Sequence, residues 1–235
     1  MKSMIKGKLG VSFLLKLFLD TILTEWDLYT GIRVSKVQMS NLPYLLKIKT
    51  SSIDCEYLRR EREVLEVLKH KNLSSKGFPS LETFQITYNK KQSQVVAPDI
   101  GPSLSELVQG EPKAMNQASI INIGLQIVNR LEKLHDLGYT HGNICPSTIY
   151  FGGQDLRQLF IADFNHSQKF YNGPIWLKPN KLEQLSSGLK NPFKREPYFG
   201  DINFASSQSL NRTKTKTRRD DIESLIYVLV YLFRD

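Results

Sequence analysis

The sequence is poor in cysteine and carries no disulfide or zinc pattern. Its 235 residues include two cysteines, Cys55 and Cys145, far apart and outside any Cys-x-x-Cys or Cys/His pair of metal-binding spacing. A disulfide framework and a structural zinc site are therefore not expected. Reduced cysteines of this kind are typical of an intracellular protein, cytoplasmic or nuclear.

Long uninterrupted hydrophobic runs are also missing. The apolar stretch 9–23 follows several lysines, as a secretory signal would, but Lys16 and Asp20 interrupt it and no small-residue cleavage site follows. A second run, 225–233, is shorter, and neither is long enough to span a bilayer. We expect no transmembrane segment, and we expect the first run to form a strand or an amphipathic helix packed on the domain.

Positive charge is in excess, with 32 Lys and Arg against 23 Asp and Glu, a net charge of +9. Such a surface favours acidic or phosphorylated partners, which we expect to be proteins. The basic stretches 190–197 and 212–219 are also compatible with a nucleic-acid patch, but no aromatic platform for bases accompanies them. Nucleic-acid binding is therefore the less favoured alternative.

Hydrophobic spacing divides the chain into a strand-rich first part and a helical second part. In the first part, short apolar runs such as 44–50 predict strands, and 54–70 has a helical pattern. In the second part, 117–137 carries an apolar stripe and ends before a glycine, as a helix does. Residues 221–233 are apolar around the whole circumference, which predicts a buried helix.

Four stretches resemble the casein kinase 1 family, in the same order and at similar spacing. They are "IGPSLSELV" (100–108), "GYTHGNICPSTIYF" (138–151), "IADFN" (161–165) and "RRDDIESLIYVLVYLF" (218–233). They stand where that family has the segment after its hinge, its catalytic loop, its metal-binding motif and its central helix. The resemblance covers roughly residues 22–233.

The resemblance implies an α+β, bilobal protein-kinase-like fold. It places a small β-rich lobe with one helix over 22–100 and a mainly helical large lobe over 101–235, after an N-terminal extension over 1–21. Members of the family continue through further helices. We therefore expect an incomplete large lobe, truncated after the central helix.

Several residues match the family's nucleotide site. Lys47 stands where a strand lysine clamps the phosphates, and Glu61 stands where a helix glutamate pairs with that lysine. Lys49 and Glu63 are the alternative pair if the register shifts.

The hinge and the metal site also have matching residues. At the hinge, the resemblance implies that the Pro98 carbonyl and the Ile100 N–H contact adenine, because proline lacks an N–H but keeps its carbonyl. Asp163 corresponds to the metal-binding aspartate of the family's D-F-G motif.

Four further positions correspond to structural residues of the family. His141, Phe164 and Leu65 fall where the family stacks an apolar spine. Asp221 corresponds to a buried aspartate of the central helix that holds the catalytic-loop backbone by hydrogen bonds. A buried carboxylate requires such partners, so we expect a structural role.

The catalytic loop departs from the family's pattern at four positions. Asn143 stands in place of the aspartate that accepts the proton of the substrate hydroxyl, and an amide is not a useful base. Cys145 replaces a lysine that neutralises phosphoryl charge, and Thr148 replaces an asparagine that holds a second magnesium ion. Gly142 replaces the adjacent arginine. We therefore expect no intact catalytic residue.

The glycine-rich phosphate loop is absent. We place Thr24, Glu25 and Trp26 near the glycine positions, where side chains block the approach of phosphate. Asn165 replaces the D-F-G glycine, a mild change because asparagine tolerates left-handed backbone angles. Asn203 replaces an arginine of the family's anion site. ATP binding is expected to be weak or absent, and ATP and Mg²⁺ are the cofactors implied if any nucleotide binding survives.

These features favour a casein kinase 1-like pseudokinase that acts as a protein-binding or scaffolding domain. The first alternative is a weakly active Ser/Thr protein kinase that uses Lys47, Glu61 and Asp163 to transfer the γ-phosphate of ATP to protein hydroxyls. The second is a basic binding module for acidic partners or nucleic acid.

Overall fold

The computed structural model divides the chain into two compact units. The first comprises 1–74 and 79–99, and the second comprises 75–78 and 100–235. The residues that the structure describes are 19–27, 32–39, 46–51, 56–74, 76–81, 83–87, 92–98, 100–108, 115–152, 155–172, 175–176, 200–210 and 216–233.

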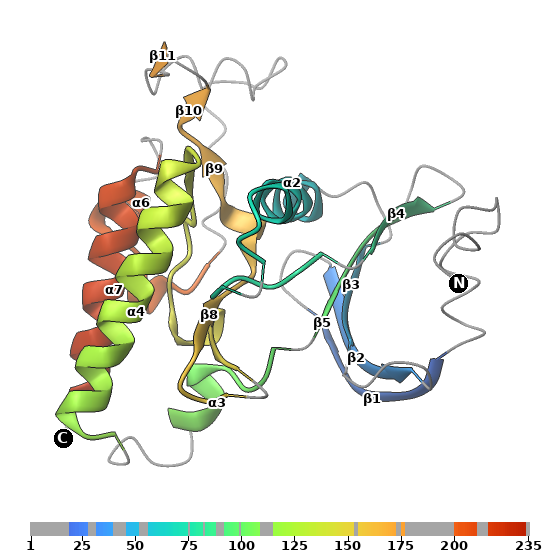
Figure 1. The fold of residues 1–235 in the computed structure, drawn as a ribbon, viewed down its shortest axis with the longest axis horizontal. Helices are drawn as coiled ribbons and strands as arrows, with labels where there is room; N and C mark the ends of the chain where they lie inside the picture. Colours follow the sequence, from blue (N-terminus) through green and yellow to red (C-terminus); the bar gives the residue numbers. More distant parts are fainter. Residues whose placement is uncertain are drawn as a thin grey trace. The chain divides into compact units, whose positions relative to one another are not determined.

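The first unit is built on an antiparallel sheet of five strands in the order β1-β2-β3-β5-β4 (Figure 1). The strands are β1 (Leu19–Asp27), β2 (Ile32–Met39), β3 (Leu46–Ser51), β4 (Thr83–Thr87) and β5 (Gln92–Pro98). The sequence predicts β3 to within two residues. It also predicts two strands around a polar turn for β4 and β5.

The first unit also contains one long helix, α2 (Glu56–His70), which the sequence predicts over 54–70. Its buried apolar residues recur at helical spacing, so one face packs on the unit and the charged residues surround it. These buried residues are Leu58, Val64, Leu65 and Leu68.

The link between β1 and β2 corrects one sequence prediction. β1 ends at Asp27 and β2 begins at Ile32, so the connection is residues 28–31. Glu25 is a strand residue paired with Ser35, and its two neighbours lie in the same strand. The stretch 19–27 contains no glycine, and a strand accommodates its apolar and threonine residues. Thr24, Glu25 and Trp26 therefore lie in strand β1 and not in the connection between the two strands.

The second unit is mainly helical, with short strand pairs and 3₁₀ turns (Figure 1). Its helices are α3 (Leu104–Val108), α4 (Gln117–Asp136), α6 (Ser207–Leu210) and α7 (Arg218–Leu232). Its 3₁₀ turns are η3 (Pro146–Thr148), η4 (Phe164–His166) and η5 (Ile202–Phe204). Its strands pair as β6 (Tyr139–Thr140) with β9 (Gln168–Lys169), β7 (Ile149–Phe151) with β8 (Leu159–Ile161), and β10 (Tyr171–Asn172) with β11 (Ile175–Trp176).

Helix α4 is fixed at both ends by its sequence. The Asn116 side chain caps its first turn by accepting a hydrogen bond from the Ser119 N–H at 2.8 Å. At the other end Gly138 adopts φ 85°, a left-handed conformation that glycine enters without strain. The helix lies beside α7 (Figure 1), and a Cβ at Gly124 would lie 3.1 Å from the Leu229 side chain.

Helix α7 is buried on one side only, whereas its apolar circumference predicted burial all round. Leu225, Val228 and Leu232 are buried, but Ile226 and Val230 are 52% and 56% exposed. Among the described residues, no helix combines the length and the apolar character needed to cross a bilayer.

The second unit also takes in the short segment 75–78, which the sequence predictions assigned to the first lobe. The carbonyl of Gly77 accepts a hydrogen bond from the Ile161 N–H at 3.0 Å, and the buried ring of Phe78 lies 6.4 Å from that of Phe164. This segment therefore extends the core around η4.

Candidate functional site

A buried ion pair in the first unit corrects the predicted lysine. Glu61 accepts a bond of 2.6 Å from the Lys49 ammonium, and both side chains are about 95% buried. The partner of Glu61 is thus Lys49 and not Lys47, which was the first choice. Lys49 is therefore the lysine of β3 that reaches Glu61 on α2.

The predicted hinge residues fall on the two sides of the boundary between the units. Pro98 is the last residue of β5 and pairs with Leu46 in the first unit. Ile100 belongs to the second unit, where it packs against a buried cluster of Tyr150, Phe160 and Ala162.

Asp221 anchors the loop that follows β6. Its carboxylate accepts hydrogen bonds from the N–H of His141 at 2.8 Å and the N–H of Gly142 at 2.7 Å. The ring of His135 on α4 lies 2.9 Å from the same carboxylate through Nε2. Asp221 is 1% exposed. These bonds are the ones that the resemblance implied, and they satisfy the buried charge.

His141 is held as a neutral ring. Nε2 lies 3.0 Å from the Ala162 carbonyl, and Nδ1 lies 3.3 Å from the Asn143 N–H. The first contact needs a proton on Nε2 and the second needs a lone pair on Nδ1, which defines the neutral tautomer. Complete burial lowers the pKa of His141, although the charge of Asp221 opposes this. The ring packs edge-on against Phe164 at 5.2 Å.

The position of the family's arginine has no room for a side chain. Gly142 adopts φ 77°, and a Cβ there would lie 2.5 Å from the carbonyl oxygen of His166. The Lys216 ammonium donates a hydrogen bond to the Gly142 carbonyl. The local backbone therefore requires glycine, and a lysine from the segment before α7 brings positive charge to this point.

Asn143, at the position of the catalytic base, is bonded within the unit. Its Oδ1 accepts a hydrogen bond from the Asp201 N–H at 3.1 Å, and its backbone carbonyl accepts one from the Thr148 hydroxyl at 3.0 Å. The side chain thus joins the loop to the segment that precedes η5. The sequence gives no signal for this contact, because the two residues are 58 positions apart.

Cys145 and Thr148 are turned into the protein. Cys145 is 1% exposed, and burial raises the pKa of its thiol. Thr148 is 3% exposed, and its hydroxyl lies 3.0 Å from the Cys145 carbonyl and 3.2 Å from the Cys145 N–H. Neither side chain is available to a phosphate or a cation in this arrangement.

Asp163 sits in a left-handed turn, with φ 69° and ψ 55°. Its Oδ2 accepts a hydrogen bond from the Tyr150 hydroxyl at 2.8 Å. Asn165, the replacement for the D-F-G glycine, does not have a left-handed angle. Among the described residues, the only non-glycine residues with positive φ are Asn72 and Asp163.

The donor set does not fit the two-magnesium arrangement that the resemblance implies. Asp163 is bonded to a phenol, and Thr148 directs its hydroxyl to the backbone. In the part of the chain that the structure describes, no group of three or more His, Cys, Asp or Glu residues is placed to hold a metal ion. Mg²⁺ usually takes one or two carboxylates together with substrate phosphates, and here the one matching carboxylate already accepts a hydrogen bond on Oδ2.

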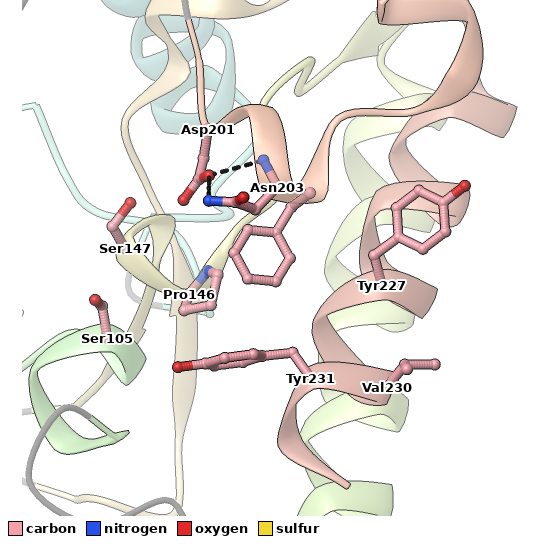
Figure 2. A pocket seen from close by; sticks show the side chains of 9 residues that line it. Ser105, Pro146, Ser147, Asp201, Asn203, Tyr227, Val230 and Tyr231 are labelled. Atoms are coloured by element: carbon pink, nitrogen blue, oxygen red, sulfur yellow. Dashed lines mark hydrogen bonds between the residues drawn. The ribbon is translucent and has the colours of Figure 1, made fainter. Parts of the chain in front are cut away.

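A cavity of about 560 Å³ opens beside the loop (Figure 2). It lies between α3, η3, η5 and α7, and aromatic rings and hydroxyl groups form much of its wall. Asp201 is the one charged side chain in the lining, and its Oδ1 accepts hydrogen bonds from the backbone and the side chain of Asn203. The lining residues are Ser105, Pro146, Ser147, Asp201, Asn203, Phe204, Tyr227, Val230 and Tyr231.

Comparisons with known proteins point to protein kinases. No protein-family model matches the sequence. The chain is 29% identical over 140 residues to the casein kinase 1-like protein HD16 of Oryza sativa subsp. japonica, covering 57% of this chain and 18% of HD16. It is 25% identical to the B1 kinase of variola virus, covering 69% and 51% of the two chains. It is also 25% identical to the human serine/threonine-protein kinase VRK3, covering 74% and 35%.

A solved structure supports the same conclusion about the fold. The structure of vaccinia related kinase 3 matches with a TM-score of 0.64 at 19% identity, over 89% of this chain and 67% of that one. This chain spans from about a fifth to about half of the length of the three curated relatives. The chain is a protein kinase-like domain with the bilobal α+β kinase fold.

Proposed function

We propose that this protein kinase-like domain is a pseudokinase similar to casein kinase 1, with impaired ATP binding and phosphotransfer, that acts by binding other proteins. The observation that carries the proposal is at Asn143. The side chain at the base position is a neutral amide, and its oxygen already accepts the Asp201 N–H. As a neutral amide, it has no basic site with which to take a proton from an alcohol at neutral pH.

The size of the loss supports this reading. General-base assistance contributes about 10²–10⁴-fold to a reaction rate, or about 3–5 kcal/mol of activation free energy. The buried positions of Cys145 and Thr148 remove two further contributions, which do not add simply to the first. Phosphoryl transfer depends mainly on positioning and electrostatics, so these losses fall on the main source of catalysis.

The Lys49–Glu61 pair is the observation that favours the alternative, a weakly active Ser/Thr kinase. Active kinases need a lysine–glutamate pair of this kind to hold the phosphates. Here the pair is intact and buried. A buried ion pair also has a purely structural use, because each charge compensates the other in a site with little access to water.

The cavity beside the loop is the proposed contact for a protein partner. Among the described residues, the lining contains one carboxylate and no lysine or arginine, so these residues offer no cation to neutralise an acidic or phosphorylated side chain. The tyrosine rings and Asp201 suit a cationic side chain instead, through contact with the rings and charge pairing. The expectation of acidic partners therefore applies to the basic stretches 190–197 and 212–219, most of which lie outside the described residues.

A thermal-shift titration with ATP and Mg²⁺ tests the nucleotide part of the proposal. When ATP and Mg²⁺ are added, wild-type protein is expected to show no rise in Tm that depends on Lys49 and Asp163. The matched variants are Lys49→Ala, Asp163→Ala and, as a control on the same strand, Lys47→Ala. A rise of several degrees in wild type that Lys49→Ala and Asp163→Ala abolish, and that Lys47→Ala keeps, would contradict the proposal.

A further inference from the structure

The phenol of Tyr150 is the part of the site that the predicted functions leave unexplained. Its hydroxyl donates a hydrogen bond of 2.8 Å to Oδ2 of Asp163, the carboxylate that the resemblance assigned to the metal. The residue is 7% exposed, and its ring belongs to a cluster with Phe160 and Ala162, against which Ile100 packs. A ring held in this way has little freedom to move its hydroxyl away from the carboxylate.

The backbone around the pair fixes both partners. Tyr150 is the central residue of β7 and pairs with Phe160 of β8. The Ala162 N–H donates to the Thr148 carbonyl at 3.0 Å and continues the pairing to the residue before Asp163. The backbone of Asp163 then adopts a left-handed conformation, and contacts in the surrounding structure must offset its free-energy cost. The hydrogen bond from Tyr150 is one contact that supports it.

We propose that the Tyr150 hydroxyl takes the place of a divalent cation at Asp163, so that this domain binds no metal ion there. The inference rests on the proposed function and deepens it by naming what blocks the site. A cation on Oδ2 would have to share that oxygen with the phenol proton, whose partial positive charge repels it. Thr148 offers no compensating ligand, because its hydroxyl faces the Asn143 and Cys145 carbonyls.

The effect of this hydrogen bond on the affinity of Asp163 for a cation follows from the strength of the bond. A hydrogen bond to a charged group is worth about as much as a 10- to 100-fold change in an equilibrium constant. Removing the hydroxyl is therefore expected to tighten cation binding at Asp163 by about that factor. Adding a second ligand at position 148 is expected to tighten it further.

Mn²⁺ is the probe, added as its chloride salt to the full chain and followed by electron paramagnetic resonance and by the shift in Tm. Wild type and the control Tyr139→Phe, which loses the hydroxyl of another buried tyrosine in the same unit, are expected to bind no Mn²⁺ at millimolar concentration beyond the level of Asp163→Asn. Tyr150→Phe, and more strongly Tyr150→Phe with Thr148→Asn, are expected to gain binding that adding Asp163→Asn removes.

Either of two results would overturn the inference. One is Mn²⁺ binding by wild type that Asp163→Asn abolishes, a measurement that needs no change at Tyr150. The other is a folded Tyr150→Phe protein, carrying Thr148→Asn or not, that binds no more Mn²⁺ than wild type. Mn²⁺ binding by wild type without phosphate transfer would overturn this inference alone, whereas phosphate transfer by wild type would overturn the proposed function.

Discussion

Polar groups in the loop 141–148 are bonded to one another or to α7 and the segment before it. The Asp221 carboxylate accepts hydrogen bonds from two backbone N–H groups, and the Lys216 ammonium donates one to a backbone carbonyl. The Thr148 hydroxyl bonds within the loop. At the scale of single residues, the substituted residues Gly142, Asn143 and Thr148 therefore all make contacts within the second unit. Replacing one side chain by its kinase counterpart would have to break such contacts before it could restore chemistry.

The Lys49–Glu61 pair gives a prediction about stability. Removing one partner leaves a buried charge uncompensated, so Lys49→Met is expected to lower the free energy of unfolding by about 3–5 kcal/mol. The double variant Lys49→Met with Glu61→Leu is expected to recover most of that loss. Lys47→Met is the matched control. Urea unfolding measures all four proteins, and a larger loss for Lys47→Met than for Lys49→Met would refute the assignment.

Cys145 gives a prediction about reactivity and pH. Burial raises the pKa of its thiol, so the folded chain keeps the proton under conditions where an unfolded thiol, with a pKa of about 8.5, ionises. The contribution of the buried thiol to the free energy of unfolding is fully present below the pKa of the unfolded thiol, and it is lost as the pH rises toward the folded-state pKa. In a Cys55→Ser background, we expect slow labelling by iodoacetamide at pH 8 and rapid labelling in urea. Rapid labelling of the native protein would show that the thiol is accessible and ionised.

Residue-level sequence reasoning succeeded where a role depends on a position along one element. Asp221 could be assigned because its place in a helix and the need of a buried carboxylate for donors both pointed to the loop. The choice between Lys47 and Lys49 could not be made, because residues two apart in a strand have the same place in its alternating pattern. The Tyr150–Asp163 bond and the Asn143–Asp201 bond depend on tertiary placement that no local pattern encodes.

At the scale of elements, helical and strand periodicity predicted α2, α4 and the strand pairs closely. The turn between β1 and β2 was misplaced, because the match to the family's sequence was followed instead of the position of glycine. The apolar residues on all sides of α7 predicted a helix buried all round, but one side is exposed. The hydrophobic pattern of a helix shows which residues it carries and not which elements pack on it.

The cavity between α3, η3, η5 and α7 gives a prediction about partners (Figure 2). A fluorescent peptide rich in arginine is expected to bind more tightly than the same peptide with glutamate, as measured by anisotropy at fixed salt. Tyr231→Ala and Asp201→Asn are expected to weaken the binding, each by about 5- to 30-fold if one contact of 1–2 kcal/mol is lost. Tighter binding of the glutamate peptide would reverse the proposed partner chemistry.

At the scale of the whole molecule, the fold of a kinase is retained, and residues at the positions of the family's catalytic loop bond within the second unit. The two lobes could be predicted because four motifs kept their order across the chain. Whether the domain transfers phosphate stays a proposal. The sequence indicates an amide in place of the family's carboxylate at Asn143, and the structure adds that the amide oxygen accepts a hydrogen bond from the Asp201 N–H.

Transfer of radiolabelled phosphate from ATP to casein by highly purified protein tests the central claim most directly. Wild type is expected to give no more product than Asp163→Ala, which controls for contaminating kinases. Product formed by wild type at an ordinary kinase turnover of about 1–100 s⁻¹, and lost in Asp163→Ala, would contradict the account.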